Sequence, residues 1–223
     1  MRELPSSNLY RIIGFDRAVQ LLKTNELYFA HPSSWDDPYE RGLIHQDSQN
    51  LFAQCWCRKA VSDAMWRIYS SNSLGVRIGT THSQLEAALS QAKKAQNLNF
   101  KIQKVKYLYQ EELDFELKRI ERALKSKHSV SMAMSQLFLK RRAFSHESET
   151  RVVIYASSFD DEVRKAFSIK VDAKSLINSV WIDPRAPQEY VDAFTSYLKK
   201  DVKFKGVVKK SSLYAARTPQ DAE

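Results

Sequence analysis

Two glutamates and an arginine alternate just ahead of an apolar run in the last third of the chain, in the order Glu147-Ser148-Glu149-Thr150-Arg151. In extended backbone, such alternate side chains point to one face. Two carboxylates this close repel, which raises the pKa of at least one unless a cation such as Arg151 intervenes. A carboxylate fixed at the end of a strand beside an arginine is suited to stabilising a cationic sugar. The alternative is a surface strand in which the pattern is purely structural.

A second candidate is Arg11, which stands in the otherwise apolar run Leu9-Tyr10-Arg11-Ile12. A guanidinium that points inward needs an anionic partner, and a phosphate can be that partner through paired hydrogen bonds. The same arginine could instead face water from an edge strand.

A segment rich in aromatic, hydroxyl and carboxylate side chains follows, from Leu27 to Glu40. It combines rings able to stack on a base, such as Tyr28, with the hydroxyls of Ser33 and Ser34, and two prolines restrict its shape. This composition is typical of a ligand pocket, although a rigid structural loop would have it too.

The 223-residue chain carries a net charge of +9, and the excess is unevenly spread. The basic C-terminal segment 199–217 holds seven basic residues and one acidic residue, and so accounts for six of the nine charges. Aromatic residues interleave with these cations, as in proteins that bind single-stranded nucleic acid. A solvated charged face is the alternative. The predicted nucleic-acid-binding residues are Lys140, Arg141, Arg142, Lys203, Lys205, Lys209 and Lys210.

Composition excludes several classes of protein. Hydrophobic residues make up 43% of the chain, which is enough for a packed core. No apolar run approaches the roughly 20 residues that span a bilayer, and no secretory signal precedes the first motif. A cytoplasmic protein without a membrane partner is therefore predicted. Two cysteines, Cys55 and Cys57, make neither a disulfide framework nor a zinc ligand set, so no metal ion is predicted.

Hydrophobic periodicity predicts alternating short strands and helices. Ser62 is expected to cap a helix that carries Met65 and Trp66, and Asp16 to cap the first helix. The mixed order predicts an α+β class, with mostly antiparallel split β-sheets flanked by helices in a single domain over residues 1–223. Strands are expected at 8–13, 26–30, 76–79, 100–109, 151–155, 167–171, 180–182, 202–208 and 212–215, and helices at 16–24, 83–96, 111–127, 130–142 and from 187 onward.

Taken in order, these motifs resemble the bacterial domain-of-unknown-function 2971 family over about residues 8–215. The family's usual loop has asparagine where this chain has Asp36, and its usual strand motif has tryptophan where this chain has Phe144. The family name implies no activity. The residues that carry the resemblance are Tyr10, Arg11, Leu27 to Phe29, Pro32, Trp35 to Glu40, Met65, Trp66, Tyr69, Gly75, Lys140, Phe144, Glu147, Glu149 and Arg151.

The same order is similar to the Arg–Ser–Glu arrangement of ADP-ribosyltransferases, in which two antiparallel sheets enclose NAD. The similarity implies an ADP-ribosyltransferase-like fold, in which Arg11 holds the phosphates or a ribose of NAD and Tyr28 stacks near the nicotinamide. Ser33 or Ser34 would match the serine of that arrangement. The cofactor-binding residues predicted on this basis are Tyr10, Arg11, Tyr28, Ser33, Ser34, Trp66 and Arg151.

The similarity also implies catalytic roles for the two glutamates. Glu149 would stabilise the sugar cation as nicotinamide leaves, and Glu147 would orient or deprotonate the acceptor. NAD is then a substrate, and the basic charge favours a nucleic acid as acceptor, RNA rather than single-stranded DNA. Related small transferases are toxins of toxin–antitoxin or phage-defence systems, so an antitoxin is a candidate partner.

Three other readings stay open at the level of sequence. The first is a nucleic-acid-binding protein without catalytic activity. The second is a metal-dependent nuclease that holds magnesium through Asp36, Asp37, Glu40 and Glu149. The third is a module that binds another protein.

Overall fold

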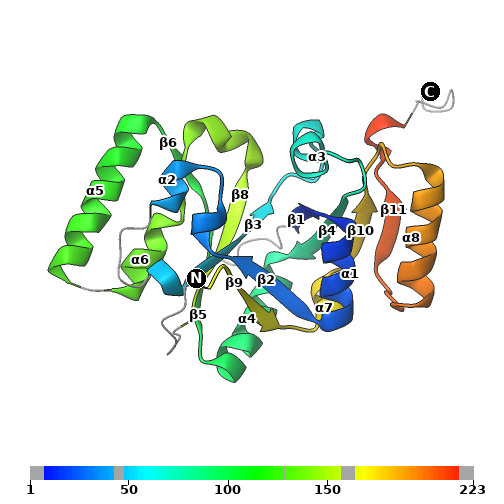
Figure 1. Cartoon of the computed structure of the whole chain (residues 1–223), viewed down its shortest axis with the longest axis horizontal. Coiled ribbons are helices and arrows are strands. Elements are labelled where there is room, and N and C mark those ends of the chain that lie inside the picture. Colours follow the sequence, from blue (N-terminus) through cyan, green and yellow to red (C-terminus); the bar gives the residue numbers. More distant parts are fainter. Residues whose placement is uncertain (1–7, 43–47, 128, 157–163, 216–223) are drawn as a thin grey trace.

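The computed structural model describes residues 8–42, 48–127, 129–156 and 164–215. Within these residues, nine strands form one mostly antiparallel sheet (Figure 1). Two further strands, β6 (Lys106–Leu108) and β7 (Leu139–Arg141), form a parallel pair. The strands of the large sheet are β1 (Asn8–Ile13), β2 (Glu26–Ala30), β3 (Leu51–Cys57), β4 (Val76–Thr81), β5 (Asn99–Lys104), β8 (Glu149–Tyr155), β9 (Ala166–Lys170), β10 (Ser179–Ile182) and β11 (Val207–Lys210).

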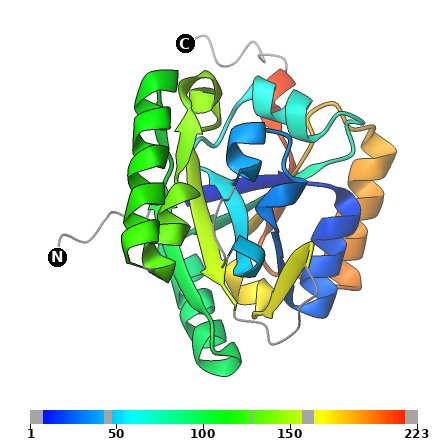
Figure 2. The ribbon, with the colours of Figure 1, turned by 60° about the vertical axis from the view of Figure 1, so that its left-hand side comes forward.

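Helices flank the large sheet (Figures 1 and 2). They are α1 (Phe15–Thr24), α2 (Pro38–Arg41), α3 (Asp63–Tyr69), α4 (His82–Gln96), α5 (Gln110–Ser126), α6 (Val130–Gln136), α7 (Ala173–Leu176) and α8 (Gln188–Lys200). Within the described residues, no helix combines the length and the apolarity needed to cross a membrane.

The sheet divides at β3. One edge of β3 pairs with β8 over seven residues, and β8 pairs in turn with β5. The other edge pairs with β1 only at Tyr10–Cys57 and with β2 only at Ala30–Ala53. Beyond these two points β1 continues into the arm β1-β4-β10-β11, and β2 continues into β2-β9. The predicted α+β class with a mostly antiparallel, split sheet is therefore confirmed.

The two faces of β3 and β8 have different neighbours. Side chains such as Trp56 and Val152 point into the main core, which α1, α4, α7 and α8 help to enclose. Ala53 and Val153 point the other way, into a smaller core beneath α5 and α6. Further along that second face stand Cys55, Cys57, Glu149 and Arg151, where the α5–α6 cover has ended. This uncovered stretch is where a site can form.

Several predicted elements differ from the observed ones. The helix expected at 130–142 ends at Gln136, because Leu137 and Phe138 are buried in the smaller core and the chain then extends into β7. The strand expected at 100–109 breaks at Val105, where the chain leaves β8 to pair with β7. Gly14, rather than Asp16, is the N-cap of α1.

The basic C-terminal segment also differs from the prediction. Of the strand expected at 202–208, only the last two residues belong to β11. Lys203 has a left-handed backbone (φ 56°), and the Phe204 amide donates to the Leu198 carbonyl, so residues 202–206 close the end of α8 instead. Residues 212–214 form a 3-10 turn rather than a strand. Arg217 lies outside the described residues.

Candidate active site

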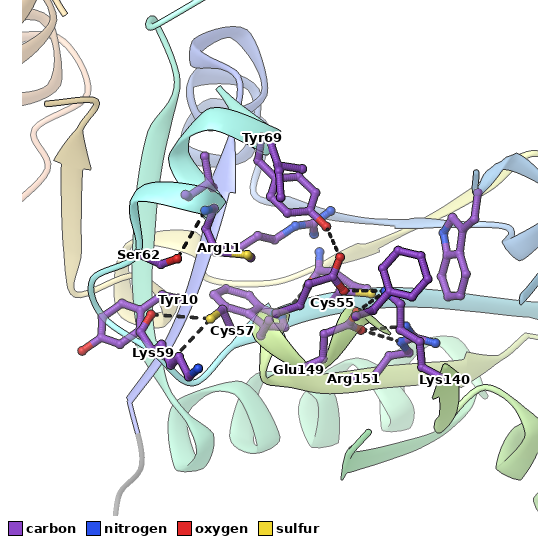
Figure 3. Close-up of a pocket in the computed structure, with 18 of the residues that line it drawn as sticks. Tyr10, Arg11, Cys55, Cys57, Lys59, Ser62, Tyr69, Lys140, Glu149 and Arg151 are labelled. Carbon is purple, nitrogen blue, oxygen red and sulfur yellow. Dashed lines mark hydrogen bonds and ion pairs between the residues drawn. The ribbon is translucent and has the colours of Figure 1, made fainter. Parts of the chain in front are cut away.

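A cavity of about 550 Å³ opens over the uncovered face of β3 and β8 (Figure 3). Its walls come from β1, from the loop at 34–37, from α3 and from the residues between β7 and β8. This size lies within the range of small-molecule sites. The chemically active side chains that line it include Arg11, Cys55, Tyr69, Lys140, Glu147, Glu149 and Arg151.

Lys140 joins the two glutamates at one end of the cavity. Its Nζ lies 2.5 Å from Oε2 of Glu147 and 2.7 Å from Oε1 of Glu149. Between the glutamates, Ser148 adopts a left-handed backbone (φ 50°), so Glu147 ends a 3-10 turn and Glu149 begins β8. The two carboxylates thus meet on one cation. The extended backbone expected between them from the sequence is not observed, because Ser148 is left-handed.

Arg151 fixes Glu149 from the opposite side. Its Nε and Nη2 donate to Oε2 of Glu149 at 3.0 and 2.6 Å, and Nη2 also lies 2.7 Å from Oε1 of Glu40. Its Nη1 donates to the carbonyl of Leu137. The backbone N–H of Glu149 donates to the hydroxyl of Tyr107 at 2.8 Å. Glu149 is therefore held rigidly at both its carboxylate and its backbone.

The environment drives the pKa values of the two glutamates apart. Burial raises the pKa of Glu147 to about 7, and a hydrogen bond with Glu149 adds to this. Burial also acts to raise the pKa of Glu149, but Arg151, the bond with Glu147 and Lys140 outweigh it and hold that pKa well below its ordinary value. At neutral pH, Glu149 is ionised and Glu147 is close to half-protonated, which is a division of acid–base roles.

Helix α3 forms the opposite wall and is fixed by its cap. Ser62 is the N-cap, and its hydroxyl accepts a hydrogen bond from the Met65 amide at 3.3 Å, as predicted. The Tyr69 hydroxyl then donates to Oε1 of Glu147 at 3.2 Å, visible in Figure 3. Trp66 is buried against the cavity, and its indole N–H has no partner among the described residues.

Arg11 contributes an unpaired cation to the same cavity. It lies one residue beyond the single β1–β3 pair, where β1 and β2 separate. Within the described residues, no carboxylate forms an ion pair with it, and its charge is opposed mainly by burial, which lowers its pKa. A partly buried cation without an anionic neighbour is costly, so this position favours an anionic ligand.

The sequence of residues 65–152 matches the model of a family described as protein of unknown function (DUF2971). The match confirms the predicted resemblance from α3 to the middle of β8, and does not include residues 8–64. No curated protein matches the chain.

Three solved structures of Thermus sp. 2.9 DarT are similar to the chain at low identity. The complex with NAD+ has a TM-score of 0.41 and 13% identity, covering 94% of this chain and 96% of that chain. The complex with carba-NAD+ has a TM-score of 0.40 and 14% identity, and the match covers 93% of this chain and 97% of that chain. The complex with ADP-ribosylated ssDNA has a TM-score of 0.41 and 14% identity, and the match covers 96% of this chain and 99% of that chain. This degree of similarity assigns no activity or residue to the chain.

The structure brings together some of the predicted cofactor-binding residues and separates others. Those that line the cavity are Tyr10, Arg11, Ser34, Trp66 and Arg151.

Two predicted cofactor-binding residues lie outside the cavity lining. Ser33 is bonded instead to the ring of His31, with its Oγ 2.7 Å from Nδ1. Tyr28 is 42% exposed, and the guanidinium of Arg17 lies 5.6 Å from the centre of its ring. Of the two candidate serines, Ser34 is therefore the one near the site.

The predicted nucleic-acid-binding residues also divide. Lys140 is buried between carboxylates rather than on the surface, and it lies in β7, which pairs with β6. Arg141 pairs with Asp37 at 3.0 Å, and Arg142 lies over the ring of Tyr109. Lys203, Lys205, Lys209 and Lys210 lie at the far end of the sheet from β8.

Sequence reasoning missed the strand that supports the site. β3 is apolar at almost every position, so it lacks the alternation that marks a half-buried strand. Its Cys55 thiol forms a hydrogen bond with Glu149, and burial raises the pKa of that thiol to about 12. The register Cys55–Arg151 and Cys57–Glu149 gives the Cys-x-Cys pattern a place beside the carboxylates rather than around a metal.

The four carboxylates of the proposed nuclease site all line the cavity, but they have different partners. Asp37 binds Arg141 and caps α2, Asp36 is exposed, and Glu40 and Glu149 share Arg151. Within the described residues, no group of three or more acidic, histidine or cysteine side chains is placed to hold a metal ion. Asp37, Glu40 and Glu149 each form an ion pair with a lysine or an arginine of the chain.

Proposed function

We propose that the protein is an NAD-dependent ADP-ribosyltransferase that modifies nucleic acid. One observation carries the proposal: a single cavity contains an ionised carboxylate, Glu149, and an arginine, Arg11, that has no anionic partner in the part of the chain that the structure describes. NAD presents an anionic pyrophosphate and a glycosidic bond that breaks through a cationic ribose. The cavity offers one group of opposite charge for each.

In the proposed reaction, Arg11 binds the pyrophosphate and Glu149 faces the ribose next to the nicotinamide. The bond between the ribose C1′ and the nicotinamide nitrogen breaks, and its electron pair leaves with the nicotinamide. Glu149 stabilises the resulting positive charge because Lys140 and Arg151 hold it ionised and in place. An electron pair of the acceptor then forms a new bond to C1′.

Glu147 is the proposed base for the acceptor. With a pKa of about 7, its ionised form is well populated at neutral pH and can take the proton that the acceptor loses. Tyr69 and Lys140 orient it at the cavity wall. Two carboxylates in one site thus take different roles because their surroundings differ.

We infer the chemical class of the acceptor from the net positive charge of the protein. The net +9 and the exposed lysines of the C-terminal segment suit a polyanion, and RNA is the preferred acceptor over single-stranded DNA. A role as a toxin, with an antitoxin as partner, remains a prediction from the resemblance.

The test uses NAD labelled at the adenylate phosphate, incubated with the protein and separately with RNA, single-stranded DNA or protein as acceptor. We expect label in one nucleic-acid pool and free nicotinamide in equal amount. Glu149→Gln should lower transfer by a factor of about 100 to 1,000, whereas Glu111→Gln, an exposed glutamate at the start of α5, should not. Full transfer by Glu149→Gln, or no consumption of NAD by the unaltered protein, would contradict the proposal.

A further inference from the structure

A second pocket of about 520 Å³ lies beside the catalytic cavity, on the arm β1-β4-β10-β11. The two hollows share Tyr10, Ala60 and Arg77 as a common wall. The residues that line the second pocket include none with an acidic side chain. Nothing in the proposed reaction uses this space.

Arg77 is the unusual residue of that wall. It is only 6% exposed, yet its Nε and Nη1 have no hydrogen-bond partner among the described residues. Aromatic rings surround it instead: its guanidinium carbon lies 5.0 Å from the ring centre of Tyr10, 5.5 Å from that of Trp181 and 6.0 Å from that of Trp66. Burial lowers its pKa, but an arginine stays charged in proteins. Two unused donors on a buried cation fit an anionic oxygen atom as ligand.

The register of the strands shows how the floor of the pocket is built. Arg77 pairs with Trp181, and Trp181 pairs with Lys209, so these three side chains form a row on one face of the arm. Lys209 is exposed on β11 at the edge of the sheet, just outside the residues that line the pocket. In the next row stands Gly79, where a Cβ atom would lie 2.4 Å from Oγ of Ser179. The absence of a side chain there leaves room for the side chain of Ser179, which lines the pocket.

A row of arginine, tryptophan and lysine is a platform on which a base can stack while its phosphates meet cations. We infer that the second pocket binds one nucleotide of the acceptor strand, with a phosphate on Arg77 and the base on Trp181. Lys209 then meets a neighbouring phosphate of the strand. This inference rests on the proposed function, because it places the acceptor next to the carboxylates through the shared wall.

NAD also contains a nucleotide, and the test must separate the two sources. We would measure binding of a fluorescent single-stranded 12-mer, as RNA and as DNA, in the absence of NAD, and separately the binding of NAD alone. Lys209→Glu and Arg77→Met should each weaken binding of the oligonucleotide about tenfold, and Lys209→Glu, which lies outside the cavity lining, should leave the affinity for NAD within about twofold. Each should also reduce the slope of log affinity against log salt by about one.

The matched control is Lys200→Glu. It makes the same charge change at an exposed lysine of the same segment, but on α8, which packs on the opposite face of the sheet. It should bind the oligonucleotide like the unaltered protein. Because Lys209 is exposed, its variant keeps the test decisive if Arg77→Met fails to fold.

Two outcomes would overturn the inference. The first is that Lys209→Glu and a folded variant of Arg77, each tested singly, both bind the oligonucleotide as tightly as the unaltered protein does. The second is weaker binding of NAD, rather than of the oligonucleotide, in Arg77→Met. Since binding is measured without NAD, failure of the label-transfer experiment would contradict the proposed function separately.

Discussion

Glu147 and Glu149 are hydrogen-bonded to each other, and their pKa values are shifted in opposite directions, upward for Glu147 and downward for Glu149. The difference comes from their partners. Glu149 contacts both Lys140 and Arg151, whereas Glu147 contacts Lys140 and the hydroxyl of Tyr69. One carboxylate is thereby kept as a permanent anion, and the other is able to exchange a proton near neutral pH.

The first prediction concerns the pH dependence of Glu147. Transfer should rise with pH through about 7 and then level off, because the ionised form is the base. In Glu147→Gln this titration should disappear and the remaining activity should be low at every pH. A pH–rate profile of kcat with a saturating acceptor is the measurement, and a variant that kept the step near pH 7 would refute the assignment.

The same residue has a consequence for stability. Its pKa is raised in the folded state, so the folded protein binds more protons than the unfolded chain between about 4.5 and 7. The stability that protonated Glu147 contributes is fully present below 4.5 and is lost as pH rises through 7. Urea unfolding at pH 5 and pH 8 should show a loss of about 1 to 3 kcal/mol in the unaltered protein that is absent in Glu147→Gln.

The second prediction is that Arg11→Met separates binding from stability. Since no carboxylate of the described residues pairs with Arg11, removing its charge should leave the thermal midpoint unchanged or raise it. The affinity for NAD should fall about 10- to 100-fold, because a charged contact with the pyrophosphate is lost. Calorimetric titration and a melting curve measure the two effects. Arg17→Met, at an exposed arginine of α1, is the control and should change neither.

The third prediction concerns the cap of α3. Ser62→Ala removes the acceptor for the Met65 amide and should cost about 1 kcal/mol of unfolding free energy. Because α3 carries Tyr69, activity should fall modestly while the pH profile keeps its shape. A Ser62→Asp variant, which restores a capping oxygen, should recover stability. Equal stability of the alanine variant and the unaltered protein would show that the cap is dispensable.

The fourth prediction concerns Cys55. A thiol with a pKa of about 12 has very little thiolate at pH 8, so it should react with a thiol reagent about a thousandfold more slowly than an exposed cysteine. The measurement uses Cys57→Ser, which leaves Cys55 alone. Adding Ser90→Cys on the exposed side of α4 supplies the fast reference. Rapid labelling of native Cys55 would mean that its thiol is neither buried nor bonded to Glu149.

The sequence predicted most strands of the large sheet but missed β3. β1 and β2 were predicted to the residue, since their limits are marked by turns. β3 was not predicted, because its sequence has neither a period-two pattern nor the β-branched residues that marked β8, which is enclosed by the same two cores. The end of α6 was misplaced because Leu137 and Phe138 are apolar, as residues of a longer helix could also be, and their packing in the smaller core is tertiary.

For the candidate site, the chemistry of single residues was predictable and their pairing was not. Arg151 was expected to supply a cation to the glutamates, and it does so. Lys140 was expected at the surface, because a run of three basic residues usually remains solvated. Its burial depends on β7 pairing with β6, a contact between residues more than 30 positions apart that no local pattern encodes.

The left-handed backbone of Ser148 determines which residues would have to be copied together to rebuild the glutamate pair in another protein. Two glutamates alternating on an ordinary strand would stand side by side and simply repel. Here one torsion angle turns the first glutamate out of the strand, so the two can share a proton over a single lysine. A β-branched residue at position 148 would cost about 1 to 2 kcal/mol in that conformation. A designer copying the pair into another sheet would therefore have to copy the residue between them as well.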